Sequence, residues 1–383
     1  MTGADIVVQV LADEGVDTIF GYSGGAILPT YDAVFRFNDS HRRADGSAAI
    51  PLIVPANEQG AGFMAAGYAR ASGKVGVVLV TSGPGATNTV TPVRDCMADS
   101  VPIVVICGQV PRAAIGTDAF QEAPVSAIMG AVAKHVFLVT DPDKIEATMR
   151  SAFKLARTGR PGPVVVDLPK DVQNWEGLFA GGGELSMPGY ERRLDMVVSN
   201  QLDDEACKRF YEMLAQSERP LIYAGGGVIN ANAAKAMRHL ANEFGIPVTT
   251  TLMALGASDT THPLALHMLG MHGIASANYA VEDCDFLIAV GARFDDRVAG
   301  DPVNFAPRAK NIAHFDVDIA EVGKVKRVDW HHIGVIDRDL NVLLDYGRRI
   351  NFEKSFDKWH QEVASLKDKY RLNYDRDSEL IQP

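Results

Sequence analysis

One carboxylate, Glu58, stands in a setting that suits chemistry. It follows a predicted strand over residues 50–55 and opens a predicted helix that is rich in glycine and alanine. Such a surface lets a flat ligand or another backbone approach closely. Residues 75–80 are apolar throughout, which is typical of a central strand in a parallel sheet, and they lead into a Ser-Gly-Pro-Gly turn. Because ligands bind outside the carboxyl ends of parallel strands, Glu58 is a candidate site residue. The open alternative is an acid that only favours the start of its helix.

The segments around Glu58 alternate between predicted strands and helices. Strands are predicted over residues 18–20, 50–55, 75–80, 102–107 and 164–169, and helices over residues 2–14 and 144–157 and from Glu58 onward. This alternation indicates an α/β fold with a doubly wound parallel sheet. Residues 37–49 are polar and irregular, which predicts a surface loop.

The length of 383 residues predicts two domains. We place the first at residues 1–178, a glycine-rich linker at 179–198, the second domain at 199–345 and a helical tail at 346–383. The tail is expected to form one amphipathic helix, whose apolar face carries Phe352, Phe356, Trp359, Val363 and Leu366.

The composition excludes several classes of function. A net charge of −11 without a basic cluster argues against nucleic-acid binding. The four cysteines are scattered without a CxxC pair, which predicts reduced thiols and a cytoplasmic protein. No leader and no membrane-spanning run are expected, and no metal ligand set is predicted.

A second candidate site follows the predicted strand over residues 221–224. The strand runs into Gly225-Gly226-Gly227 and then a predicted helix over residues 231–244. This order is the general way to bring a nucleotide phosphate to a helix start, although the spacing is not that of the dinucleotide-binding fingerprint. A plain tight turn is the open alternative.

Several motifs carry a resemblance to a known family. Glu-Gln-Gly-Ala from Glu58, Gly-Tyr-Ala-Arg from Gly67, Thr-Ser-Gly-Pro-Gly-Ala-Thr-Asn from Thr81 and Gly-Gln-Val-Pro from Gly108 resemble the pyrimidine-binding domain of thiamine-diphosphate enzymes. The run from Ile115 to Glu122 is more specific and resembles the catalytic subunit of acetohydroxyacid synthase, the biosynthetic acetolactate synthase. The resemblance extends to about Leu344.

The resemblance implies roles for residues of the first domain. Glu58 would hydrogen-bond the aminopyrimidine ring of thiamine diphosphate, and Gly25 would lie beside the reactive ring. Phe120, Gln121 and Lys134 would lie near the substrate; for Lys134 an ordinary surface lysine is the alternative. Cofactor contacts are implied for Gly24, Pro84, Asn88 and, toward a flavin, Arg160. The chain departs from the family at Ser23, where proline is usual, and at Ala56-Asn57, where Arg-His is usual.

The second domain resembles the FAD-binding central domain of the same family, which is Rossmann-like. The implied flavin residues are Gly225, Gly226, Gly227, Thr251, Leu252, Met253, Leu269, Met271, His272, Gly291, Arg293, Asp295, Arg297, Asp316, Ile319, Glu321 and Asp337. The alternatives are a satisfied loop histidine for His272 and a surface ion-pair cluster for the residues from Arg293 to Arg297. Ile336 stands where the family usually has glycine, which weakens the expectation for Asp337.

The implied reaction condenses two pyruvates, or pyruvate and 2-oxobutanoate, with loss of carbon dioxide. The products are 2-acetolactate and 2-aceto-2-hydroxybutanoate, in branched-chain amino-acid biosynthesis. FAD would be structural or regulatory, because the net reaction transfers no electrons. No Gly-Asp-Gly motif is found, so we expect two domains of a three-domain enzyme, with Mg²⁺ ligands in the third. A homodimer or tetramer with a small regulatory subunit is implied. Open alternatives are a non-catalytic flavin-binding or regulatory module and another FAD-containing thiamine-diphosphate carboligase.

Overall fold

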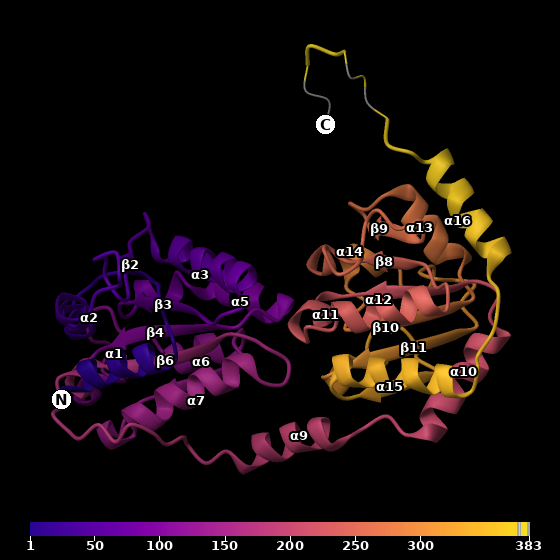
Figure 1. The fold of residues 1–383 in the computed structure, drawn as a ribbon. Coiled ribbons are helices and arrows are strands. Elements are labelled where there is room, and N and C mark those ends of the chain that lie inside the picture. The colour runs from indigo at the N-terminus through magenta and orange to yellow at the C-terminus, as the bar shows by residue number, and fades with distance from the viewer. Residues whose placement is uncertain (374, 376, 381–383) are drawn as a thin grey trace. The chain divides into compact units, whose positions relative to one another are not determined.

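The computed structural model describes residues 1–373, 375 and 377–380. The end of the predicted helical tail, residues 381–383, lies outside the described residues, as do 374 and 376. The chain divides into two units, Met1–Glu191 (unit 1) and Arg192–Pro383 (unit 2), which are drawn in Figure 1. The division falls inside the segment that the sequence predicts to be a linker.

Unit 1 is a parallel α/β sheet with helices on both faces. Its strands are β1 Ile19–Tyr22, β2 Leu52–Ile53, β3 Gly76–Val80, β4 Ile103–Gln109, β5 His135–Leu138 and β6 Val164–Pro169. Within residues 1–191, all of them described, the six strands lie in the order β2-β1-β3-β4-β6-β5. The helices are α1 Gly3–Asp13, α2 Leu28–Ser40, α3 Glu58–Ser72, α4 Pro84–Thr87, α5 Val90–Asp99, α6 Val125–Gly130, α7 Ile145–Arg157 and α8 Lys170–Gln173.

The two faces of this sheet have separate apolar clusters, because successive strand residues point to opposite sides. Val77 and Leu79 of β3 pack in a cluster with residues of α1, α2 and α7. Val78 and Val80 of the same strand pack in another cluster with residues of α3, α5 and α6. Both faces are therefore covered (Figure 1), as the uninterrupted apolar run of residues 75–80 predicts.

Unit 2 repeats this architecture. Its strands are β7 Pro220–Ala224, β8 Val248–Thr250, β9 Ala265–Met268, β10 Phe286–Val290, β11 Asn311–Asp316 and β12 Trp330–Ile333. In the described part of unit 2 they form a parallel sheet of order β12-β11-β10-β7-β8-β9. The helices are α10 Asp204–Gln216, α11 Gly226–Asn230, α12 Ala234–Glu243, α13 Ala275–Asp283, α14 Asp296–Ala299, α15 Ile336–Arg349 and α16 Asp357–Lys369, and α9 Pro188–Ser199 crosses the division between the units.

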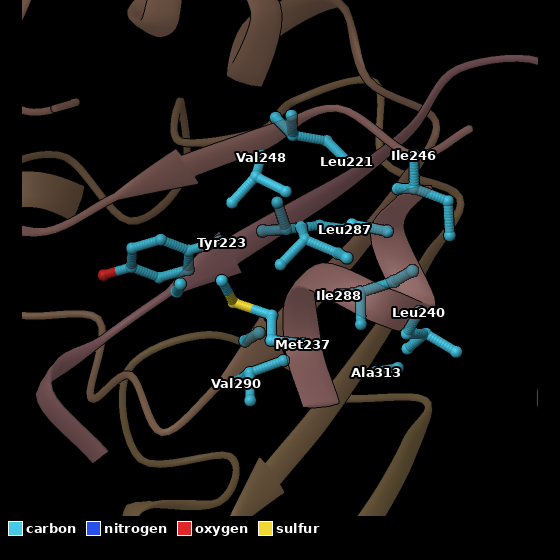
Figure 2. Packing of buried hydrophobic residues seen from close by; sticks show 14 of the residues in the cluster. Leu221, Tyr223, Met237, Leu240, Ile246, Val248, Leu287, Ile288, Val290 and Ala313 are labelled. Atoms are coloured by element: carbon cyan, nitrogen blue, oxygen red, sulfur yellow. The ribbon is translucent and has the colours of Figure 1, made fainter. Parts of the chain in front are cut away.

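One large apolar cluster holds unit 2 together. Figure 2 shows part of it, in which Met237 and Leu240 of α12 approach strand residues that include Ile288 and Val290 of β10. The fold class predicted from the sequence, two doubly wound parallel-sheet domains, is confirmed. Among the described residues, no helix is long and apolar enough to cross a membrane.

Three local predictions were wrong in detail. The predicted strand over 50–55 shortens to Leu52–Ile53, and α2 continues through Ser40 into the predicted loop. The predicted tail helix starts later than expected, because α15 of the second domain ends at Arg349 and α16 runs from Asp357 to Lys369. Phe352 and Phe356 therefore lie in the connection, whereas Trp359 and Val363 lie on α16 and are buried. The segment predicted to be a linker also contains part of helix α9, and its assignment as a linker stays a prediction.

Candidate functional site

Unit 1 has a topological switch point between β1 and β3. From β1 the chain moves outward to β2, then returns to β3 on the other side of β1. Helix α2, which follows β1, packs on one face of the sheet, and α5, which follows β3, packs on the other. The carboxyl ends of β1 and β3 therefore border the crevice in which open α/β sheets bind ligands.

The two turns that border this crevice are packed against each other. A side chain at Gly24 would lie 2.6 Å from Cβ of Thr81, so glycine is required there. The N–H of Ala26 donates to Thr81 Oγ1 at 3.4 Å. The space around Gly25 is open, since a Cβ at this position would have no neighbouring atom within 4 Å. The backbone at Gly25 is therefore accessible, while Gly24 supports the turn, and a ligand at Gly25 stays a prediction.

Glu58 is the first residue of α3 and is buried. Asn57 caps the helix, since its Oδ1 accepts from the N–H of Gly60 at 2.8 Å. Asn88 Nδ2 donates to Glu58 Oε2 at 2.9 Å. A Cβ at Gly85 would lie 3.6 Å from Glu58 Oε1, so that oxygen faces the Ser82–Gly85 turn. The structure thus brings together Glu58, Asn88 and the turn that contains Pro84. An acid that only favours the start of its helix does not need this burial or this hydrogen bond from Asn88.

Tyr31 is a neighbour of this site that the sequence did not predict. It lies on α2, is buried, and donates from its hydroxyl to the Leu79 carbonyl at 3.1 Å. Burial raises the pKa of the phenol well above its ordinary value, and the charge of Glu58 raises it further. An aromatic residue in this stretch gives no signal for the placement, which depends on how α2 packs against the end of β3.

Gln121 reaches the same crevice through its backbone. A Cβ on Gly83 would lie 2.5 Å from the Gln121 carbonyl oxygen, so the segment that carries Gln121 packs directly on the Ser82–Gly85 turn. Phe120 is 88% exposed, and Gln121 is exposed as well. Both side chains are therefore available to a ligand at the carboxyl end of β3.

Lys134 lies in a cage of carbonyl groups. Its Nζ donates to the carbonyl oxygens of Leu155, Thr158 and Arg160, the last two at 2.7 Å, and lies 3.3 Å from the Tyr190 hydroxyl. The alternative of an ordinary surface lysine is wrong, because the ammonium group is part-buried and caps the end of α7. A role toward substrate stays a prediction, and it requires these hydrogen bonds to be given up.

Arg160 is also held by its own unit. Its Nε donates to Ser100 Oγ at 2.9 Å and one Nη approaches the Ala98 carbonyl at 3.4 Å. The guanidinium therefore ties the turn before β6 to the end of α5. The predicted flavin contact of Arg160 is not tested by these bonds.

Unit 2 has its own switch point, between β7 and β10. The chain moves from β7 through β8 to β9 on one side, and β10 then pairs with the other edge of β7. Gly225 follows β7 and Gly291 follows β10. The N–H of Gly227 donates to the Gly291 carbonyl at 3.0 Å, and a side chain at Gly227 would lie 2.6 Å from Cα of Gly291. These glycines are needed for the close approach of the two loops, which is a stronger constraint than a plain tight turn.

The other predicted flavin loops lie around this switch point. The N–H of Thr251 donates to the Ala224 carbonyl at 2.9 Å, and a Cβ on Gly226 would lie 2.9 Å from Met253 Cβ. The Met271 N–H donates to the Arg297 carbonyl at 2.9 Å. Leu252, Met271 and His272 are exposed, whereas Leu269 is buried.

Charged residues of these loops are only partly paired. Arg293 and Asp295 form an ion pair at 3.0 Å, so the ion-pair alternative holds for these two residues. Asp295 also caps α14 through the N–H of Arg297, whose side chain lies 3.5 Å from Met271 Sδ. The side chain of Arg297 thus contacts the neighbouring loop, while its backbone N–H binds Asp295.

The acids that follow β11 and β12 have local partners. Asp316 Oδ1 accepts from the N–H groups of Val317 and Asp318 at 2.8 and 2.9 Å. Glu321 is buried and pairs with Lys324 at 3.1 Å. Ile319 is exposed, and Asp337 lies in the first turn of α15. Asp316 therefore shapes its own turn, and its role in binding a flavin remains a prediction.

One buried polar atom at this switch point has no internal partner. The hydroxyl of Thr251 is buried and makes no hydrogen bond within the described residues. Buried hydroxyls are almost always hydrogen-bonded, so the site fits a ligand with polar groups beside Thr251. Among the described residues, no group of three or more His, Cys, Asp or Glu side chains is arranged to hold a metal ion.

Comparison with known families gives a match for each unit. Residues 1–128 match the N-terminal TPP binding domain of thiamine pyrophosphate enzymes, and residues 207–343 match the central domain of thiamine pyrophosphate enzymes. Together the two matches cover more than half of the chain.

Curated relatives are similar along the whole chain. The acetolactate synthase large subunit of Corynebacterium glutamicum is 43% identical over 385 residues, which cover 100% of this chain and 59% of that protein. The probable acetolactate synthase large subunit of Methanocaldococcus jannaschii is 44% identical, covering 100% of this chain and 62% of the relative. A chloroplastic acetolactate synthase of Zea mays is 43% identical, with 100% and 57% covered. The chain thus spans about three fifths of the length of these relatives.

Proposed function

Because the chain belongs to the thiamine pyrophosphate enzyme family, of which it carries the N-terminal and central domains, we propose that it forms the corresponding part of an acetolactate synthase large subunit. The substrates are two pyruvates, or pyruvate and 2-oxobutanoate. The observation that carries the proposal is the buried Glu58, which is held by Asn88 beside the Ser82–Gly85 turn. It lies at the switch point of unit 1, which is where open α/β sheets bind ligands.

Thiamine diphosphate, when bound, supplies the electron sink for decarboxylation of a 2-oxo acid and for the new carbon–carbon bond. Glu58 has one oxygen engaged by Asn88 and the other facing Gly85. With the cofactor bound, Glu58 would hold a proton at the aminopyrimidine ring nitrogen through Oε1, while Asn88 fixes the orientation of the carboxyl group. The open backbone at Gly25 would leave room for the reactive ring, and Pro84 belongs to the turn that would contact the cofactor.

On the substrate side, we assign the exposed Gln121 amide to a hydrogen bond with the 2-oxo acid and Phe120 to the apolar wall that excludes water. The support is the packing of the Gln121 backbone on Gly83, which ties this segment to the same turn as Glu58. Lys134 keeps an electrostatic role only as a prediction, since its ammonium group serves three carbonyls.

FAD is proposed as the ligand of unit 2. The loops after β7, β8, β9 and β10 converge at one switch point, and the buried Thr251 hydroxyl has no partner among the described residues. Thr251, the Gly225–Gly227 turn and the Arg293–Asp295 pair are the residues we assign to it. FAD would stabilise the fold or regulate it, because condensation with decarboxylation transfers no electrons. For Mg²⁺, we propose ligands in the part of the relatives that lies outside the match.

The assembly and location are proposals of the same kind. We propose a homodimer or tetramer, supported by the exposed apolar residues Phe63 and Met64 on α3, with a small regulatory subunit as a further partner. A cytoplasmic location is supported by four buried free thiols, because reduced cysteines are typical of that compartment.

The test is acetolactate formation by the joined enzyme, which is residues 1–383 fused to the unmatched part of the C. glutamicum relative. With pyruvate, thiamine diphosphate, Mg²⁺ and FAD, we expect 2-acetolactate, and we expect 2-aceto-2-hydroxybutanoate when 2-oxobutanoate is added. Omission of thiamine diphosphate is the control. A purified, folded joined enzyme that forms neither product, or that joins a different aldehyde or 2-oxo acid instead, would contradict the assignment.

A further inference from the structure

The segment that carries Phe120 and Gln121 has an unusual backbone. It connects β4 to α6, and Gly116, Asp118 and Gln121 have φ values of +83°, +58° and +58°. The left-handed region is disfavoured for residues other than glycine. Asp118 and Gln121 therefore adopt these angles only because other interactions hold the segment.

Glu122 supplies such interactions from within the segment. One carboxylate oxygen, Oε1, accepts from the N–H of Gly116, and the other, Oε2, accepts from the N–H of Ala119 at 3.1 Å. The N–H of Glu122 itself donates to the Ala119 carbonyl at 2.9 Å. The hydrogen bond from Gly116 holds the pKa of the Glu122 carboxyl below its ordinary value. One ionised side chain thus closes the loop on which Phe120 and Gln121 are mounted.

The far end of the segment is fixed from inside the sheet. Gln109, the last residue of β4, is buried, and its Nε2 donates to the Ala123 carbonyl and to Asp167 Oδ2, both at 3.1 Å. Its Oε1 accepts from the N–H of Val110 at 2.8 Å. Glu122 therefore holds Gly116 and Ala119 from the solvent side, and Gln109 holds Ala123, just beyond the segment, from the core.

From this geometry we propose that Glu122 is a positioning residue, which orders the segment 116–122 and thereby presents Gln121 and Phe120 to the substrate. Each carboxylate oxygen accepts from a backbone N–H group of the loop, so in this proposal Glu122 acts through the loop and not through contact with substrate. The effect of Glu122 on catalysis rests on the proposed function, whereas the closure of the loop by Glu122 is independent of it.

The first test is hydrogen exchange on residues 1–383. Glu122→Gln keeps the size of the side chain, but an amide has only one accepting oxygen and cannot accept from both N–H groups. We expect exchange in residues 116–119 to become about tenfold faster or more, since a charge-assisted hydrogen bond is lost. Peptides from β3 and β4 should be unchanged, which shows that the unit is folded.

The chain offers a matched control in the same loop. Asp118→Asn removes the same charge four residues earlier, and asparagine tolerates positive φ. Since the Asp118 side chain accepts none of the backbone bonds described above, exchange in residues 116–119 should stay close to that of the parent. In Glu122→Asp the side chain is one methylene shorter, so the carboxylate lies further from the N–H groups of Gly116 and Ala119, and exchange should also become faster. This variant replaces Glu122→Gln if the latter does not fold.

The second test is kinetic and uses the joined enzyme. In Glu122→Gln we expect kcat/KM for pyruvate to fall about tenfold or more, because misplacement of a substrate-holding group is costly. The thiamine diphosphate concentration for half-maximal activity should be unchanged, which a general loss of structure would not give. Unchanged exchange in residues 116–119 would overturn the inference, as would faster exchange with an unchanged kcat/KM. If the parent joined enzyme has no acetolactate activity, the proposed function is refuted. The hydrogen exchange of residues 116–119 then still tests whether Glu122 closes the loop.

Discussion

Asp167 makes the stability of unit 1 depend on pH in a direction that the structure fixes. It lies in the interior strand β6 and is 2% exposed. Oδ2 accepts from Gln109, while Oδ1 has no hydrogen-bond partner among the described residues. Burial raises the pKa of this carboxyl from 3.8 to about 7. A buried acid with a raised pKa binds its proton more tightly in the folded state than in the unfolded state.

The consequence for stability follows from linkage. The contribution of Asp167 is fully present below pH 3.8 and is lost as the pH rises through about 7. Each pH unit within this window lowers the free energy of unfolding by about 1.4 kcal/mol. Between pH 5 and pH 7 the loss is therefore roughly 2–3 kcal/mol.

Asp167→Asn tests this reasoning, because the amide has the shape of the protonated acid and cannot ionise. We expect the parent to lose roughly 2–3 kcal/mol of stability relative to the variant between pH 5 and pH 7. Hydrogen exchange measured along a urea titration gives the unfolding of unit 1 from peptides of residues 1–191, separately from that of unit 2. Taking the difference between the two proteins removes the pH dependence of every other group. A difference that is constant from pH 5 to pH 8 would refute the argument.

Three further predictions concern single side chains. Lys134→Met should lower the stability of unit 1 by about 2–3 kcal/mol, measured by urea denaturation, because three carbonyls lose a charged donor; a stability equal to that of the parent would contradict the cage. Thr251→Val removes a buried hydroxyl that has no partner within the described residues, so the stability of unit 2 should be unchanged or higher. The same variant should bind FAD about tenfold more weakly in fluorescence titration. Unchanged affinity would argue against a flavin at this switch point. Burial alone would raise the pKa of Asp339, but hydrogen bonds from His332 and Arg338 hold that pKa below its ordinary value. Asp339→Asn should therefore lower the stability of unit 2 by about 3 kcal/mol, measured by urea denaturation. A loss below about 1 kcal/mol would show that the hydrogen bonds among Asp339, His332 and Arg338 are dispensable.

The sequence predicted most of the elements that build the two sheets. Strands such as β3 and β4 are buried on both faces, so their residues form continuous apolar runs that can be recognised without a structure. The edge strand β5, His135–Leu138, was missed, because its residues are partly exposed and lack such a run. The break between α15 and α16 had a signal in the residue Asn351, which comes just after α15 and has a φ of +50°. Asparagine is one of the residues that commonly end a helix in this conformation.

The site was predicted less completely than the fold. The place of Glu58 could be predicted, because it depends on strand order and on a turn rich in glycine. The cage around Lys134 could not, because its three carbonyls belong to the end of α7 and the loop after it, more than twenty residues away. The closure by Glu122 depends on the left-handed backbone of Asp118 and Gln121. No pattern of residue types indicates which loop N–H groups will face a carboxylate.

The central claim is that the Glu58 carboxyl group holds the proton on which acetolactate formation depends. Glu58→Gln keeps the size of the side chain and its contact with Asn88, but an amide cannot exchange that proton. As control, Asp5→Asn removes another acid from the first turn of a helix, where it takes part in the cap of α1.

The deciding measurement is the rate of acetolactate formation from pyruvate by the joined enzyme, its Glu58→Gln variant and its Asp5→Asn variant. We expect Glu58→Gln to lower kcat by about 10²–10⁴-fold, which is the range for loss of an acid–base group, with unchanged circular dichroism. Asp5→Asn should retain the parent rate. A Glu58→Gln variant that turns over at the parent rate would contradict the account.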